Sequence, residues 1–196
     1  MGNIYCLIGK SSTGKDTIYK LLLNREDLNL KRIVSYTTRP IREGELPGEE
    51  YNFVSLDERE RLIDEGKVIE MRKYDTMFGP WYYFTVDDGQ VDLENHDYLI
   101  IGTVASYLKL REFYGENIKP IYIEVDDGLR LERALKRERK QKEPKYEEMC
   151  RRFLADAVDF SKDKLKEAGI DNIFNNDEDR EDTTERIALF IKHTKG

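Results

Sequence analysis

The sequence is poor in the residues that disulfide-rich and zinc-binding proteins need. It has 2 cysteines and 2 histidines among 196 residues. Cys6 and Cys150 lie far apart, which indicates two reduced thiols rather than a disulfide framework. His96 and His193 stand in no ligand spacing, so a structural or surface role is favoured for both.

Long apolar runs and an excess of basic charge are missing as well. No apolar stretch is long enough for a membrane span, and no charged start followed by an apolar run indicates a secretory leader. The net charge is −7, from 33 basic and 40 acidic residues, so long nucleic acid is not expected as a partner. We expect a cytoplasmic protein with no membrane association. The sequence leaves open whether it is a monomer or a homodimer.

Short apolar runs and helix-periodic segments alternate along the chain, and no internal repeat interrupts them. The apolar runs lie at 4–8, 33–36, 98–101, 121–125 and 170–174. The helix-periodic segments lie at 17–24, 104–114, 129–139, 146–168 and 184–193. This alternation predicts an α/β fold, with a parallel sheet covered by helices on both faces. Ligands bind such sheets beyond the carboxyl ends of the strands.

The stretch 9–17, Gly-Lys-Ser-Ser-Thr-Gly-Lys-Asp-Thr, lies between the first apolar run and the first helical segment. Two glycines separated by four residues let successive backbone N–H groups turn inward, and the helix N-terminus adds partial positive charge. Lys15 places an ammonium where the β- and γ-phosphates of a nucleotide would lie. A turn with a chance lysine is the structural alternative. The context favours a phosphate-binding loop, with a P-loop NTPase-type sheet as its core.

The position after Lys15 departs from the usual pattern, which has a Ser or Thr there as a Mg²⁺ ligand. This chain has Asp16, followed by Thr17. Asp16 is a hard oxygen ligand that suits Mg²⁺, and Thr17 offers a hydroxyl. The alternative is that Asp16 only stabilises the helix N-terminus, with Thr17 as the metal ligand.

Two interruptions of the core are expected. Short aromatic-rich strands at 51–54, 68–72 and 81–86, with a helix at 56–64, predict a small mixed α/β lobe inserted over 37–96. The basic run at 136–145 is either a solvated helix end or part of a helical lid over 136–167. Its place after the fourth core strand favours the lid. A single domain is expected, with its core at 1–36, 97–135 and 168–196.

The loop that follows the second apolar run carries Arg39 and Arg42, and Tyr51 comes shortly after it. Guanidinium groups bind phosphate oxygens through paired hydrogen bonds, and a phenol adds a further donor. Two loop arginines are more often solvated. Their position in a protein with a phosphate loop favours a site for a monoester phosphate.

Several stretches together resemble the guanylate kinase family over nearly the whole chain. They are the phosphate loop, Ser35-Tyr36-Thr37-Thr38-Arg39-Pro40-Ile41-Arg42-Glu43-Gly44-Glu45, Gly48-Glu49-Glu50-Tyr51-Asn52-Phe53-Val54, Val68-Ile69-Glu70, Gly79-Pro80-Trp81-Tyr82-Tyr83-Phe84, Arg151-Arg152-Phe153-Leu154 and Ile173-Phe174-Asn175-Asn176-Asp177. The resemblance implies an enzyme that transfers the γ-phosphate of ATP, bound with Mg²⁺, to GMP or dGMP, giving ADP and GDP or dGDP.

The resemblance also implies roles for individual residues. ATP would be bound by Gly9, Ser11, Ser12, Thr13, Gly14, Lys15, Asp16, Thr17, Arg139 and Asn176, with Asp16 and Thr17 at the metal. The phosphate of GMP would be held by Arg39, Arg42, Tyr51 and Tyr82, and its base read by Ser35 and Glu70. Lys15, Arg39, Arg137 and Arg152 would act on the transferring group.

Two departures from the family pattern concern the acceptor. The family has an Asp-x-Asp pair in the strand that corresponds to 97–103, where this chain has no acidic residue in the second half. Asp16 is a candidate to replace one lost charge. Phe84 replaces a hydroxyl that the family directs at guanine, and a site short of one hydrogen bond tolerates related bases. A kinase for another monophosphate or phosphorylated acceptor, and a non-catalytic binding module, therefore remain as alternatives.

Overall fold

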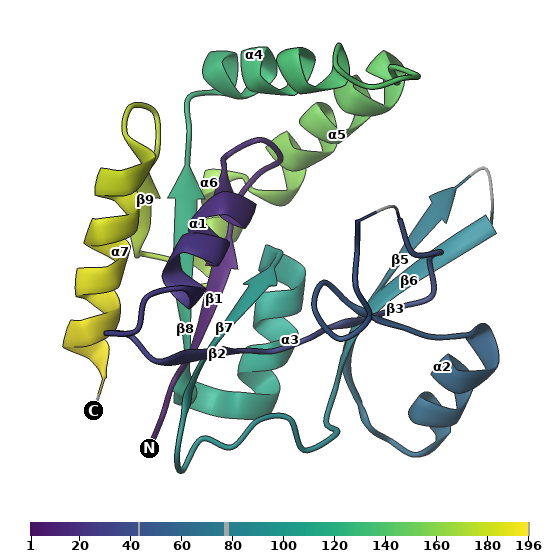
Figure 1. Ribbon diagram of the computed structural model, residues 1–196, viewed down its shortest axis with the longest axis vertical. Helices are drawn as coiled ribbons and strands as arrows, with labels where there is room; N and C mark the ends of the chain where they lie inside the picture. The colour runs from purple at the N-terminus through teal and green to yellow at the C-terminus, as the bar shows by residue number, and fades with distance from the viewer. Residues whose placement is uncertain (43, 77–78, 196) are drawn as a thin grey trace.

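The computed structural model describes residues 1–42, 44–76 and 79–195. A parallel sheet of five strands forms its centre, in the order β2-β7-β1-β8-β9 (Figure 1). The strands are β1 (Ile4–Ile8), β2 (Leu30–Arg32), β7 (Asp97–Gly102), β8 (Ile118–Glu124) and β9 (Ile173–Asn175). Every residue of β1 is buried, because β1 lies between β7 and β8 and both of its faces are covered.

Helices cover the two faces of this sheet and form two apolar clusters. On one face lie α1 (Lys15–Leu23) and α7 (Arg180–Thr194), which pack on Tyr5 and Leu7 of β1. On the other face lie α3 (Val104–Tyr114), the short η1 (Gly115–Asn117) and α6 (Lys162–Glu167). Residues of α3 and α6 pack on Ile4, Cys6 and Ile8. The predicted α/β fold with a covered parallel sheet is confirmed.

A second sheet, of four strands in the order β4-β3-β6-β5, lies beside the first (Figure 1). Its strands are β3 (Tyr36–Thr37), β4 (Asn52–Phe53), β5 (Val68–Thr76) and β6 (Gly79–Val86). The helix α2 (Leu56–Asp64) packs on this sheet through Leu62, against Phe84 and Val86. Ser55 begins α2 by accepting a hydrogen bond from the backbone of Glu58.

The strand expected at 33–36 differs from the structure. β2 ends at Arg32 in the central sheet, and β3 begins at Tyr36 in the second sheet. Ile33 is buried at 4% exposure, so the apolar run is part of the core. It marks the crossing between the sheets, and an apolar run alone does not show where strand pairing stops.

The helix expected over 146–168 is two helices. α4 (Asp127–Glu138) and α5 (Tyr146–Asp159) stand at one end of the molecule, and α6 follows α5. Phe160 ends α5 and stacks on Tyr122 of β8 with ring centroids 6.2 Å apart. Ser161 then begins α6 by accepting from the backbone of Lys164. Phe160 is thus buried where the chain changes direction between the two helices.

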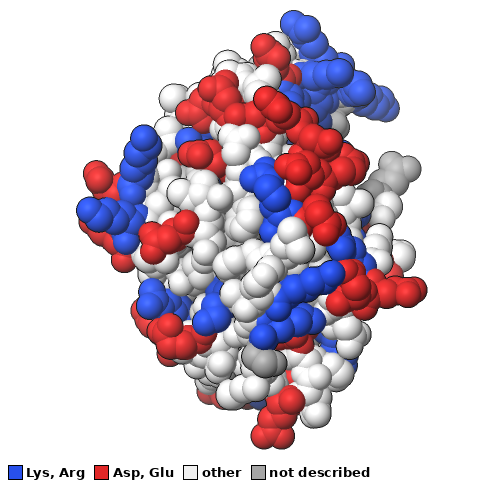
Figure 2. All heavy atoms as spheres, turned by 90° about the vertical axis from the view of Figure 1, so that its left-hand side faces the viewer, with Lys and Arg blue, Asp and Glu red and all other residues white. Residues whose placement is uncertain are grey.

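Charged side chains are spread unevenly over the surface. Lys and Arg cluster at the top of the molecule in Figure 2, the end at which α4 and α5 lie in Figure 1. Among the helices described, none has the length and apolar character needed to cross a bilayer.

Candidate active site

The loop between β1 and α1 has the backbone geometry of an anion cradle. Ser12 and Gly14 have φ values of 66° and 85°, in the left-handed region. A Cβ on Gly9 would lie 2.8 Å from the carbonyl oxygen of Ile123, and one on Gly14 would lie 2.9 Å from Asn176 Nδ2. Asn176 is buried and donates from Nδ2 to the carbonyl of Thr13 at 2.8 Å. The two glycines therefore permit a close turn that the Asn176 amide holds in place.

This cradle keeps its donors available. The amides of 12–16 bind no acceptor within the described part of the chain, and the N-cap Gly14 has no side chain to satisfy them. The Ser12 hydroxyl oxygen is buried and has no hydrogen-bond partner there either. Lys15 is half-buried, and no described carboxylate pairs with its ammonium. These groups suit a phosphate chain at the N-terminus of α1.

Asp16 and Thr17 are exposed in the first turn of α1. No cluster of three or more His, Cys, Asp or Glu able to hold a metal occurs among the residues placed by the structure. Mg²⁺ at nucleotide sites takes one or two protein oxygens and completes its shell with phosphate and water. One carboxylate and one hydroxyl beside the loop fit that requirement.

The face of the second sheet that carries Glu70 forms the other half of the site. Glu70, Arg72 and Tyr74 lie on this face of β5, opposite Thr85, Tyr83 and Trp81 of β6. Glu70 is buried, and Thr85 donates its hydroxyl to Glu70 Oε1 at 2.9 Å.

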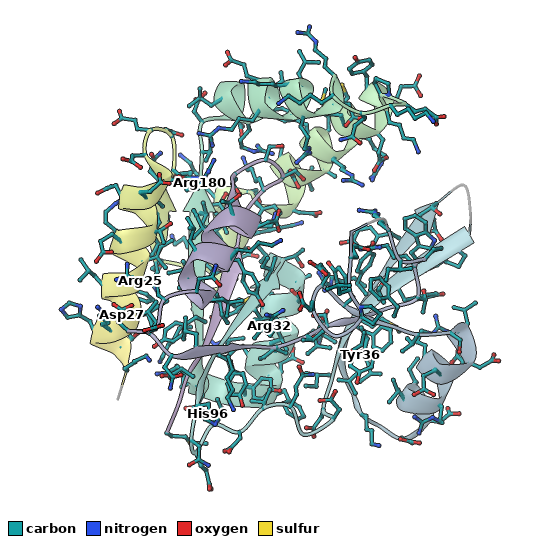
Figure 3. The ribbon with its side chains drawn as sticks, viewed as in Figure 1. Arg25, Asp27, Arg32, Tyr36, His96 and Arg180 are labelled. Atoms are coloured by element: carbon teal, nitrogen blue, oxygen red, sulfur yellow. The ribbon has the colours of Figure 1, made fainter. Side chains whose placement is uncertain are left out.

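Thr85 corrects the expectation that Phe84 leaves the site without a hydroxyl. Phe84 is fully buried on the opposite face, where it stacks on Tyr36 at 5.5 Å; Tyr36 is labelled in Figure 3. The next residue, Thr85, places a hydroxyl on the face that carries Glu70. Sequence reasoning missed Thr85 because the strand register was not known.

The same register separates Tyr82 from the place predicted for it. Tyr82 lies under α2, where the Arg59 guanidinium stacks on its ring at 3.7 Å. Its neighbour Tyr83 lies on the Glu70 face, with its ring centre 5.5 Å from that of Tyr51, whose ring lies 5.2 Å from the Arg39 guanidinium. The structure therefore brings Tyr83, and not Tyr82, together with the predicted phosphate-binding residues.

Arg39 and Tyr51 come together as the sequence predicts. Arg39 is buried, and its guanidinium lies 5.2 Å from the centre of the Tyr51 ring. Burial raises the pKa of the Tyr51 phenol, and Tyr83, Arg72, Arg39 and Asp16 are near enough to contribute to the net shift. In Figure 1 the second sheet stands on the opposite side of α1 from α7.

Glu45 organises the arginine loop and was not among the predicted residues. Its carboxylate accepts from Arg39 Nη1 at 2.7 Å and Nη2 at 2.5 Å, and from the backbone of Arg42 at 2.8 Å. This pairing with Arg39 lowers the pKa of Glu45 to about 2. Arg39 Nε keeps no partner among the described groups, whereas Arg42 is exposed. Glu43, within the same quoted stretch, lies outside the described residues.

Ser35 is buried where the chain passes between the two sheets. Its backbone carbonyl accepts from the amide of Asn52 at 2.9 Å. Its predicted contact with a base stays a prediction.

The basic residues of α4 and α5 fall into two groups. Arg137 and Arg152 line a small pocket with Ser11 and Ser12 of the loop. Arg139, the residue that follows α4, lies beside Lys136 and Lys140 on a different surface. The structure thus brings two of the three predicted arginines to the phosphate loop.

Arg130 and Asp156 join these helices to the loop, and neither was predicted. Arg130 is buried and donates from Nε to the carbonyl of Ser11 at 3.0 Å and from Nη2 to Asp156 at 2.8 Å. Asp156 also accepts from the amide of Ser11 at 2.7 Å. Arg180, at the start of α7, is a further missed candidate: its Nε would lie 4.0 Å from a Cβ on Gly14 (Figure 3).

Comparison with known proteins agrees with this arrangement. The sequence model of the family described as guanylate kinase matches residues 1–107, which include the loop and the second sheet. The guanylate kinase of Mannheimia succiniciproducens is 42% identical over 85 residues, 43% of this chain and 39% of that protein. The guanylate kinase of Bacillus subtilis is 31% identical over 118 residues, 60% of this chain and 56% of that protein.

A longer match reaches into the second half of the chain. The guanylate kinase of Chlorobaculum tepidum is 32% identical over 136 residues, 68% of this chain and 67% of that protein. The crystal structure of guanylate kinase from Anaplasma phagocytophilum matches with a TM-score of 0.71 and 24% identity, covering 99% of this chain and 86% of that one. At that identity the structural match shows the fold.

The fold and the loop define an α/β protein of the P-loop class. Because the family model covers more than half of the 196 residues, the chain belongs to the guanylate kinase family. The matched segment covers between 38% and 56% of each of the first curated relatives.

Proposed function

We propose that this protein transfers the γ-phosphoryl group of ATP to GMP or dGMP, giving ADP and GDP or dGDP. One observation carries the proposal: the chain holds two sites with different chemistry, the phosphate loop after β1 and the face of the second sheet that carries Glu70. The phosphate loop offers the Lys15 ammonium and backbone amides that bind no acceptor within the described part of the chain. The second sheet offers Arg39, Tyr51 and Tyr83 for a phosphate, with Glu70 and Thr85 for a base.

Glu70 suits guanine for a chemical reason. A carboxylate accepts two parallel hydrogen bonds, and guanine presents N1–H and the exocyclic amine side by side. Adenine presents no such pair. Thr85 holds one carboxylate oxygen, which leaves Glu70 orientated toward the face on which Tyr83 also lies.

Phosphoryl transfer demands positioning and charge neutralisation more than covalent chemistry. Lys15 and the loop amides would hold the donor phosphates, and Arg137 and Arg152 would approach from the helices above. Mg²⁺, held by Asp16 or Thr17, would neutralise charge on the β- and γ-phosphates. The acceptor phosphate oxygen is already ionised at neutral pH, so the scheme requires no general base.

We propose the same division of labour for the segments of the chain. Residues 37–96 would form the acceptor lobe, 136–167 the lid, and 1–36, 97–135 and 168–196 the core. Closure of lobe and lid would exclude water and prevent ATP hydrolysis. The unpaired Cys6 and Cys150 and the use of ATP favour the cytoplasm.

A second candidate acceptor is a different nucleoside monophosphate. β7 ends in Ile100, Ile101 and Gly102, and the side chain of the next residue, Thr103, caps α3. The carboxyl end of β7 therefore sends no carboxylate toward the acceptor. A pocket with this reduced negative charge gives a physical reason to include other bases in the assay.

The test is ADP release from ATP and Mg²⁺ with GMP, dGMP, IMP, AMP, UMP or CMP as acceptor. We expect the highest kcat/KM with GMP or dGMP. Lys15→Ala should lower kcat by about 100-fold or more, because it removes a donor directed at the transferring charge. Arg39→Ala should raise KM for the acceptor. Absence of ADP release with every acceptor, together with no heat of ATP binding, would instead indicate a binding module.

A further inference from the structure

Arg72 occupies the edge of Glu70 that the proposed function reserves for the base. Arg72 Nε lies 3.1 Å from Glu70 Oε2, and Arg72 Nη2 lies 3.3 Å from Oε1. Both side chains leave β5 on the same face, two residues apart. The Glu70 side chain is 2% exposed and that of Arg72 is 21% exposed. The Glu70 carboxylate is therefore shielded from solvent, whereas the Arg72 guanidinium is partly accessible to it.

The chemistry of this pair matches that of guanine. The guanidinium presents two parallel N–H donors, one to each oxygen of the carboxylate. Guanine N1–H and its exocyclic amine present the same two donors in the same parallel arrangement. Thr85 already holds a third position on Oε1. A carboxylate has one edge from which both oxygens accept in parallel, so Arg72 and guanine cannot use it together.

We propose that Arg72 is an internal competitor of guanine for Glu70, and that it lowers the selectivity of the site for guanine. This inference rests on the proposed function of the same site. Guanine has to displace the guanidinium before Glu70 can read it, which weakens GMP binding. A base without the two donors leaves the ion pair intact and finds a neutralised Glu70.

Arg72 also changes the free-energy cost of burying the Glu70 carboxylate under a base. Without Arg72, a base such as adenine would bury the Glu70 charge with only the Thr85 hydroxyl as a partner, and a buried charge without a counter-charge is strongly unfavourable. With Arg72 in place that cost is absent. Arg72 therefore weakens the binding of guanine and removes the penalty against other bases, and both effects reduce discrimination.

The experiment is calorimetry of GMP, IMP and AMP binding to the full chain, as wild type and as Arg72→Ala. We expect Arg72→Ala to bind GMP about tenfold more tightly, the change that corresponds to about 1.4 kcal/mol. AMP should bind more weakly, so the GMP-to-AMP ratio of affinities should rise by more than tenfold. IMP, which has N1–H but lacks the amine, should gain less than GMP.

Lys73→Ala is the matched control. Lys73 is the next residue of β5, lies on the other face and pairs with Asp75 at 2.8 Å. Lys73→Ala removes one positive charge from β5, as Arg72→Ala does. A general effect of net charge on nucleotide affinity would therefore appear in both variants. We expect the wild-type ratio of GMP to AMP affinity in Lys73→Ala.

Weaker GMP binding in Arg72→Ala, with AMP binding unchanged, would overturn the inference and make Arg72 a residue that positions Glu70. If that variant fails to fold, the wild type still provides a test. The Nε–H resonance of Arg72 in a ¹⁵N spectrum should shift on addition of GMP and stay in place with AMP. An Nε–H that is unmoved by saturating GMP would contradict displacement. Wild type that binds no monophosphate would instead overturn the proposed function.

Discussion

At the scale of single residues, the composition of the face that carries Glu70 depends on the side of β6 from which each side chain leaves. Tyr83 and Thr85 point toward Glu70 and Arg39, whereas Tyr82 and Phe84 point toward α2. Neighbouring residues of a strand face opposite ways, so two tyrosines adjacent in sequence belong to different environments. This alternation makes Tyr82 a close control for Tyr83.

We expect Tyr83→Phe to raise the KM for the acceptor by about tenfold, because the lost hydroxyl is a donor on the face that carries Tyr51 and Arg39. Tyr82→Phe removes the same atom from the other face and should leave that KM within about twofold. Steady-state kinetics with varied acceptor at saturating ATP make the comparison. A larger effect from Tyr82→Phe would return the phosphate-binding role to Tyr82.

The Arg39–Glu45 pair makes the stability of the arginine loop depend on pH. The pKa of Glu45 is lowered from 4.5 to about 2 by Arg39. A carboxyl whose pKa is depressed on folding stabilises the fold fully above its unfolded pKa, and this contribution is lost as pH falls toward the folded pKa. The contribution is therefore complete above about pH 4.5 and declines between about pH 4.5 and 2.

Glu45→Gln should be destabilised by about 2 kcal/mol at pH 7, the usual size of a hydrogen bond to a charged group. The difference from wild type should shrink as the pH falls below 4.5. Urea unfolding of both proteins at pH 7, 5, 4 and 3 measures it. A difference that stays constant across this range would show that the Glu45 charge does not contribute.

The sequence predicts residue types at the site better than the faces they occupy. The pattern of glycines and Lys15 fixes the loop, because the strand, turn and helix are contiguous in the chain. Assigning Tyr82 and Phe84 required the register of a hairpin whose strands are 9 and 8 residues long, with an irregularity between Val68 and Glu70. A slip of one residue exchanges the two faces of a strand. Short-range patterns do not resolve such a slip.

At the scale of elements, α4 and α5 are joined to the phosphate loop by a partly buried polar network. Arg130 of α4 connects the Ser11 carbonyl with Asp156 of α5, and Asp156 accepts the Ser11 amide. Phe153 stacks on the same guanidinium, with its ring centre 4.9 Å away. Long-range contacts of this kind, across 119 residues between Arg130 and Ser11, leave no signal in local sequence.

Arg130→Met should therefore loosen the helices from the loop. It leaves the carboxylate of Asp156 without its guanidinium, and breaking a buried pair in this way costs about 3–5 kcal/mol. We expect a lower melting temperature, a raised KM for ATP and faster amide exchange at Ser11 and in α5. Hydrogen exchange with mass spectrometry locates the change.

Lys136→Met provides the control for that experiment, because Lys136 lies on the outer surface of α4. It should leave exchange at Ser11 unchanged. In the double variant Arg130→Met with Asp156→Leu, no charge remains unpaired, so part of the lost stability should return. Additive losses in the double variant would contradict coupling between the two side chains.

At the scale of the whole molecule, the two apolar clusters meet at β1, whose residues alternate between them. Ile4, Cys6 and Ile8 belong to the cluster under α3, and Tyr5 and Leu7 to the cluster under α1 and α7. The five consecutive apolar residues that predicted a buried strand thus serve two cores. The phosphate loop begins directly after this strand, so its position follows from the most buried element of the fold.

The reactivity of the Cys6 thiol depends on this enclosure of β1. This thiol is fully buried, and burial raises its pKa to about 12, whereas Cys150 is exposed. At pH 8 a thiol of that pKa is roughly one part in ten thousand thiolate, and only the thiolate reacts with a disulfide reagent.

We therefore expect Ellman's reagent to react rapidly with one thiol of the native protein, and with two thiols in guanidinium. Cys150→Ser should release none rapidly in the native state and one when unfolded. Two fast equivalents from native wild type would show that β1 is not enclosed between helices on both faces.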